Sequence, residues 1–131
     1  MSAIRVLYVE DDMDDLEIVS SIVLSDSKQD FDIINEPTLE GAMIALAEKD
    51  IDIILLDLSL PDSIGIETVK AIKEACGHIP IIVISGTSDR TIYEEAVALG
   101  VYKMVHKDYL TTNYLSASII LAAKRYGVDL N

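Results

Sequence analysis

The chain has 131 residues, half of them apolar, and its formal net charge is −13. This length suits one folded domain with a hydrophobic core, and this composition excludes a largely disordered chain. The acidic balance argues against nucleic-acid binding, because the neutralisation of phosphates needs a basic face.

Short apolar runs rich in Ile and Val predict five β-strands. In chain order they are Ile4–Val9, Phe31–Ile34, Ile53–Leu56, Ile81–Ile84 and Val101–His106. After each run, apolar residues recur at the spacing of a helix, and Gly100 is placed to end the fourth of these helices. Strict alternation of strands and helices predicts an α/β fold, with a parallel sheet covered by helices on both faces.

The polarity of the strands predicts their order in the sheet. Ile53–Leu56 and Ile81–Ile84 are apolar at every position, as central strands covered on both faces should be. The second and fifth runs contain polar residues, which is typical of edge strands. The order 2-1-3-4-5 meets both requirements.

Polar residues follow directly after four of the strands. Glu10 and Asp11 follow the first, Asp57 follows the third, Ser85 follows the fourth, and Lys107 follows the fifth. Open α/β sheets bind ligands outside the carboxyl ends of their strands, where the strand order reverses. In the predicted order the reversal falls between strands 1 and 3, so we expect these side chains to meet there.

Three carboxylates at one place create a charge problem with a chemical consequence. Two carboxylates about 5 Å apart repel by roughly 3 kcal/mol at an effective dielectric constant near 20. Such a cluster either raises its own pKa values or recruits a cation, and an oxygen-only site suits Mg²⁺. Lys107 can pair with Asp57 and later with a phosphoryl group, and a carboxylate can itself be the nucleophile that becomes an aspartyl phosphate.

Four motifs, in this order along the chain, carry a family resemblance: "VLYVEDD", "IILLDLSLPDSIGIE", "IPIIVISGTSD" and "MVHKD". Together they resemble the receiver domain of two-component response regulators, the chemotaxis-regulator-like phosphoacceptor domain. The resemblance implies a flavodoxin-like, doubly wound sheet of five strands with five helices. It makes Asp57 the phosphoacceptor, Ser85 the switch hydroxyl and Lys107 the phosphate-pairing lysine. It implies Mg²⁺ as the cofactor, with these ligands: Glu10, Asp11, Asp57 and the carbonyl of Ser59.

The same resemblance implies partners and an output. The phosphoryl donor is a histidine kinase or a histidine phosphotransfer protein, and the domain itself catalyses the transfer and a slow autohydrolysis, as a switch rather than a turnover enzyme. Phosphorylation then changes partner binding, or homodimerisation, on the face of helix 4, strand 5 and helix 5. That face is expected to include four tyrosines: Tyr93, Tyr102, Tyr109 and Tyr114.

We expect residues 1–131 to be a single receiver domain, either stand-alone or the N-terminal domain of a longer regulator that acts on a downstream effector. No apolar run is near 18 residues, and the N-terminus lacks the layout of a signal peptide. The lone Cys76 cannot form an internal disulfide. These features predict a cytoplasmic protein.

Two positions depart from the family pattern. The family usually has an aromatic residue three positions before the lysine, where this chain has Met104, so the usual aromatic switch is replaced by a packing side chain. The family lysine is usually followed by a proline with a cis bond, whereas Asp108 follows Lys107 here. Because a cis bond before a non-proline residue costs about 2.5–4 kcal/mol, we expect a trans bond.

Other polar residues have simpler interpretations. We assign Asp12, Asp14 and Asp15 to the N-terminus of the first helix, where the helix dipole favours acids. His78 and His106 are interpreted as structural, and Cys76 as a packed or surface thiol at the end of the third helix.

Three alternative functions compete with that of a receiver. A phosphorylation-independent interaction module would have the same fold, but the complete set of acids, Ser85 and Lys107 argues against it. A flavodoxin-like FMN protein needs a phosphate loop after strand 1, where "EDDMDD" would repel a phosphate. A haloacid-dehalogenase-like phosphatase usually has Asp-x-Asp, whereas Leu58 and Ser59 follow Asp57.

Overall fold

A computed structural model describes residues 3–26 and 28–127 of the chain. Its main sheet has five parallel strands in the order β2-β1-β3-β6-β7, which confirms the predicted order and both edge strands. The strands are, in chain order, β1 Ile4–Val9, β2 Phe31–Glu36, β3 Ile53–Leu56, β6 Ile81–Ser85 and β7 Lys103–His106. The last strand begins two residues later than predicted, because Val101 and Tyr102 belong to the turn that leaves α4.

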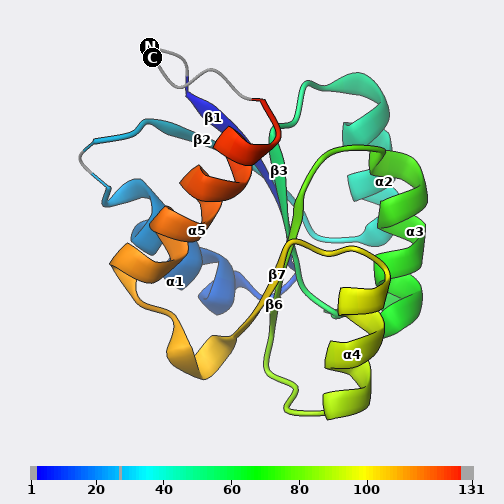
Figure 1. The fold of residues 1–131 in the computed structure, drawn as a ribbon. Coiled ribbons are helices and arrows are strands. Elements are labelled where there is room, and N and C mark those ends of the chain that lie inside the picture. Colours follow the sequence, from blue (N-terminus) through cyan, green and yellow to red (C-terminus); the bar gives the residue numbers. More distant parts are fainter. Residues whose placement is uncertain (1–2, 27, 128–131) are drawn as a thin grey trace.

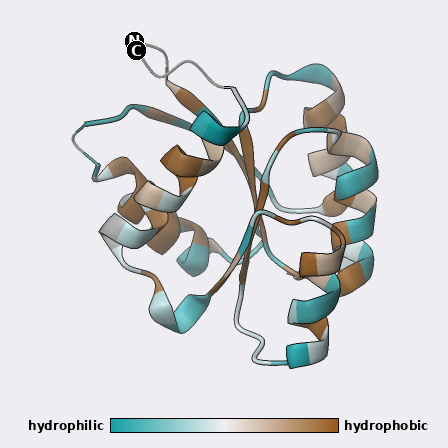
Figure 2. Ribbon diagram, in the orientation of Figure 1, coloured by the Kyte–Doolittle hydropathy of each residue, from teal (hydrophilic) through white to brown (hydrophobic). Residues whose placement is uncertain are grey.

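Helices cover both faces of the sheet (Figure 1). On one face lie α1 (Met13–Leu24) and α5 (Thr112–Arg125). On the other lie α2 (Leu39–Glu48), α3 (Ile66–Cys76) and α4 (Arg90–Ala98). Figure 2 shows the apolar strands between the helix layers, with hydrophilic residues toward the outside.

The sheet separates two hydrophobic cores. One core joins Leu56 and Val83 to α2, α3 and α4, and the other joins Leu55 and Ile82 to α1 and α5. Every residue of β3 and of β6 is buried, as the sequence predicted for central strands. Alternate residues of these strands therefore serve different cores, which holds their carboxyl ends rigidly.

Local signals place the helix ends. The side chain of Asp12 caps α1 by accepting hydrogen bonds from the backbone N–H groups of Asp14 and Asp15. Gly100, with a φ of 90°, follows the end of α4 and confirms the predicted helix stop. In the described residues, no helix is long and apolar enough to cross a membrane.

A small hairpin absent from the prediction follows Asp57. It pairs β4 (Ser59–Leu60) with β5 (Ser63–Ile64) in antiparallel fashion, with Pro61 and Asp62 in its turn. Gly65, with a φ of 75°, closes this loop by donating its backbone N–H to the carbonyl of Leu58 at 2.7 Å. The Asp62 carboxylate accepts from the first two N–H groups of α2, at Leu39 and Glu40.

The central strands predict a measurable difference between two apolar positions. We expect Leu55→Ala, at a fully buried site, to lower the free energy of unfolding by about 2–5 kcal/mol, because it leaves a cavity between β3 and the α1–α5 layer. Ile44→Ala, at a side chain 52% exposed on α2, should change it by only about 0.5 kcal/mol. Urea denaturation measures both, and equal losses would contradict the two-core description.

Candidate functional site

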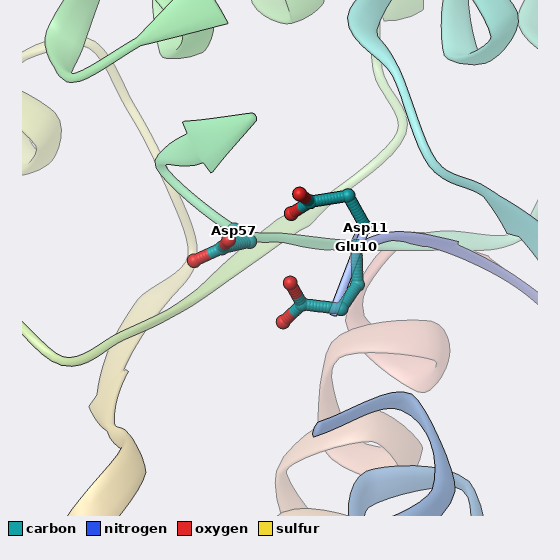
Figure 3. A group of neighbouring side chains, drawn as sticks. All are labelled: Glu10, Asp11 and Asp57. Carbon is teal, nitrogen blue, oxygen red and sulfur yellow. The ribbon is translucent and has the colours of Figure 1, made fainter. Parts of the chain in front are cut away.

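Glu10, Asp11 and Asp57 meet at the carboxyl edge of the sheet, as predicted. One carboxylate oxygen from each of them lies within 4.8 Å of the others. Figure 3 shows Glu10 and Asp11 after the end of β1 and Asp57 after the end of the adjacent β3. The backbone N–H of Asp57 donates to the carbonyl of Val9 at 3.1 Å, which continues the pairing of these strands up to the site.

Glu10 is the most deeply buried acid of the site, at 1% exposure. Its carboxylate accepts hydrogen bonds from the hydroxyl of Tyr8 and from the backbone N–H of Asp12, at 3.2 and 3.3 Å. Burial and the charge of Asp57 raise the pKa of Glu10 to about 7, although Lys107 acts in the opposite direction. Burial and the Glu10 charge likewise raise the pKa of the Tyr8 hydroxyl, so Tyr8 stays a neutral donor.

Lys107 supplies positive charge to this cluster. Its ammonium lies 3.2 Å from Glu10 and 3.5 Å from Asp57, which confirms the expected pairing with Asp57. Its shortest ion pair is with Asp15, at 2.6 Å. Burial disfavours the charged ammonium, but the hydrogen bond to Asp15 and the charges of Asp57 and Glu10 outweigh burial and raise the pKa of Lys107.

Asp12, Asp14 and Asp15 occupy the cap and the first turn of α1, as predicted. The carboxylate of Asp15 has a further contact that the sequence did not predict, because it also pairs with Lys107 in the site. Nothing in the sequence separates Asp15 from Asp12 and Asp14 as the acid that faces the crevice, because all three lie at the N-terminus of one helix.

Ser85 and Ser59 line the same cavity as Asp57 and Lys107. This cavity has a volume of about 380 Å³ and also touches Gly65, in the loop after Asp57. Ser85 ends β6, is 6% exposed, and accepts a hydrogen bond from the backbone N–H of Thr87. Ser85 therefore borders the cavity from the end of β6, and Ser59 borders it from the hairpin.

The fit of a metal ion follows from the chemistry of these donors. The cluster offers oxygen atoms only, from Glu10, Asp11 and Asp57, and such hard donors suit a hard divalent cation. Burial and then the charge of Asp57 raise the pKa of Glu10, and the charge of Lys107 offsets only part of this effect.

The residues that depart from the family pattern are also placed. Met104 is half-buried against the α2–α3–α4 core, which confirms its role in packing. The Lys107–Asp108 bond is trans, as expected.

His106 has a structural role, because its Nδ1 accepts a hydrogen bond from the backbone N–H of Asp108 and caps the short 3-10 helix η1 (Lys107–Tyr109). His78 is exposed in a loop, and Cys76 is a buried thiol whose pKa is raised by burial.

The predicted output face combines α4, β7 and α5. Three of its tyrosines are exposed: Tyr93 at 51%, Tyr109 at 74% and Tyr114 at 44%. Tyr102 is half-buried and packs edge-on against Tyr126. A second cavity of about 320 Å³, lined by Ser85, Tyr93, Met104 and His106 among others, connects this face to the end of β6.

Comparison with known proteins identifies the family to which these residues point. The model of the response regulator receiver domain matches residues 6–119. The cell cycle transcriptional regulator CtrA of Caulobacter vibrioides is 31% identical over 108 residues, which cover 79% of this chain and 46% of CtrA. The heme response regulator HssR of Staphylococcus saprophyticus is 29% identical over 95% of this chain and 54% of its own.

Solved structures show the same fold. A receiver domain from Methanospirillum hungatei superposes with a TM-score of 0.83 at 18% identity, covering 95% of this chain and 97% of that one. The chain spans between a fifth and about half of the length of the curated relatives it matches.

The buried Glu10 predicts how stability depends on pH in metal-free buffer. Its pKa is near 7 in the folded chain and near 4.5 when unfolded, so between these values the folded state binds the extra proton and stability falls as pH rises. Glu10→Gln resembles the protonated form and should lose this dependence. We expect its stability relative to the wild type to rise by about 2–3 kcal/mol between pH 5 and pH 8.

Urea denaturation at several pH values in EDTA measures this difference. Glu17→Gln, which removes an exposed carboxylate from α1, is the matched control and should follow the wild type. A constant difference between Glu10→Gln and the wild type would show that Glu10 has an ordinary pKa.

Proposed function

Because the chain belongs to the response regulator receiver family, with its phosphoacceptor role in two-component signalling, we propose that it accepts a phosphoryl group on Asp57 in an Mg²⁺-dependent reaction. The observation that carries the proposal is the meeting of Asp57 with Glu10, Asp11 and Lys107 at one edge of the sheet. The proposed donor is the phosphohistidine of a kinase or of a phosphotransfer protein.

The proposed transfer begins with Asp57 as the nucleophile. A carboxylate oxygen of Asp57 attacks the phosphorus atom, a P–O bond forms, the P–N bond breaks, and the leaving imidazole takes up a proton. Both cores pack against β3, so the residue that follows this strand is held in a fixed position. Fixed positioning of the nucleophile is one of the main contributions that a protein makes to phosphoryl transfer.

The other residues would handle charge. Glu10, Asp11, Asp57 and the carbonyl of Ser59 are the proposed ligands of Mg²⁺, which when bound offsets negative charge on the carboxylates and on the incoming phosphoryl group. Lys107 would pair with a phosphoryl oxygen in place of the Asp57 carboxylate, and the Ser85 hydroxyl would donate to another. Hydrolysis of the aspartyl phosphate by water would then reset the domain.

We propose that the signal leaves through α4, β7 and α5, by a shift in the population of two conformations. Ser85 borders both the cavity beside Asp57 and the cavity beside Met104 and Tyr93, which gives a physical route between the two places. The output is proposed to be contact with a downstream effector or a second copy of the chain. The chain would act as one receiver domain in the cytoplasm, alone or at the N-terminus of a longer regulator.

Intact mass and Phos-tag mobility test the chemistry directly. With acetyl phosphate and Mg²⁺, the wild type should gain one phosphoryl group, and Asp57→Asn should gain none. EDTA and Asp11→Asn should each suppress the gain, whereas Asp32→Asn, which removes the same charge from the exposed part of β2, should not. No adduct on the wild type, with a phosphotransfer protein also tried as donor, would favour the phosphorylation-independent interaction module.

Sedimentation velocity tests the proposed output face. Beryllofluoride with Mg²⁺, a phosphoryl mimic, should raise the sedimentation coefficient of the wild type toward that of a dimer. Val97→Asp on α4 should abolish the rise, because it places a charge at a side chain 51% exposed on that face. Ile18→Asp, at a similarly exposed position on α1, should keep it. Unchanged sedimentation of the wild type would remove dimerisation from the proposal.

A further inference from the structure

The ammonium of Lys107 is closer to Asp15 than to either of the acids that the proposed reaction uses. The three Nζ–oxygen distances are 2.6 Å to Asp15, 3.2 Å to Glu10 and 3.5 Å to Asp57. The Lys107 and Asp15 side chains are 24% and 33% exposed, so the pair is partly removed from water. A short, charge-assisted bond of this kind is stronger than a fully solvated surface pair.

Asp15 is held by a rigid element. It lies in the first turn of α1, and its backbone N–H donates to the capping carboxylate of Asp12 at 3.1 Å. Lys107 comes from the other end of the chain, in η1 directly after β7. The ion pair therefore attaches the ammonium at the end of the long Lys107 side chain to the first turn of α1.

The other two partners of Lys107 have competing tasks in the proposed reaction. Glu10 and Asp57 both belong to the group of oxygen donors that could hold a metal ion, and Asp57 is also the proposed nucleophile. Asp15 is outside that group. It is the acid that can keep its bond to Lys107 while the others bind a cation or react.

We propose that Asp15 is a positioning residue, which holds the Lys107 ammonium beside Asp57. The ammonium is then already in place to pair with the incoming phosphoryl group. This rests on the proposed phosphorylation of Asp57. A free lysine side chain has many accessible rotamers, and a bond to α1 removes much of that freedom before the reaction begins. Asp15 contacts neither the phosphoryl group nor the reacting atoms and acts only through Lys107.

The matched pair for the test is Asp15→Asn and Asp14→Asn. Both substitutions remove one negative charge from the first turn of α1. Asp14 is exposed, whereas Asp15 forms the ion pair with Lys107. Asp15→Glu keeps the charge and serves as the conservative rescue. If Asp15→Asn does not fold by circular dichroism, Asp15→Ala takes its place, because alanine is well tolerated in a helix.

The first readout is the rate constant of phosphorylation at saturating acetyl phosphate and Mg²⁺, with the apparent dissociation constant for Mg²⁺ measured separately. We expect Asp15→Asn to react about tenfold more slowly than Asp14→Asn, with equal affinity for Mg²⁺, and Asp15→Glu to regain most of the rate. Equal rates for Asp15→Asn and Asp14→Asn would overturn the proposal. A slower rate explained entirely by weaker Mg²⁺ binding would also overturn it.

The second readout does not depend on phosphorylation. The ¹⁵N-detected ammonium signal of Lys107, assigned with Lys107→Arg, should be visible and slowly exchanging in the wild type and in Asp14→Asn, and lost in Asp15→Asn. An unchanged signal in Asp15→Asn would overturn the positioning role. If the wild type takes no phosphoryl group at all, the proposed function fails, and this signal alone decides whether Asp15 orders Lys107.

Discussion

The pairing of one ammonium with several carboxylates is the interaction on which the site depends. Glu10 and Asp57 are nearly fully buried, and two buried acids at this separation would repel each other strongly without a cation. Lys107 reaches both of them and also Asp15, so strands β1, β3 and β7 and the start of α1 converge on a single charged group. The residual excess of negative charge is what makes the crevice receptive to a divalent cation.

Strand β3 and the loops around the cluster hold its acids in place. β3 carries no polar residue, and both of its faces are buried, so the strand is rigid up to the point at which Asp57 begins. The hairpin after Asp57 and the carboxyl end of β6 then leave a cavity open to solvent next to the acid. Asp57 is itself 4% exposed but lines this cavity, so a ligand that enters the cavity meets an acid held by a rigid strand, as a nucleophile requires.

Much of this arrangement could be predicted from the sequence, because strand polarity and alternation determine the order of a doubly wound sheet. That order in turn predicts that Glu10, Asp11 and Asp57 lie together at the carboxyl edge of the sheet. Asp15 was missed because the first turn of a helix attracts acids for a general electrostatic reason, and sequence alone does not show which of three neighbouring acids points inward. The β4–β5 hairpin was missed because strands of two residues leave no periodicity to detect.

The division of the molecule into two cores has a consequence for the α4–β7–α5 surface. Met104 packs into one core and the next residue, Val105, into the other, so α4 and α5 are stabilised by separate sets of contacts on opposite faces of the sheet. Substitutions in the separate cores should therefore have nearly additive effects on stability, whereas substitutions along β7 should not. A change in packing at β7 can therefore shift one helix layer while the opposite layer keeps its contacts, because the two faces of this edge strand belong to different cores.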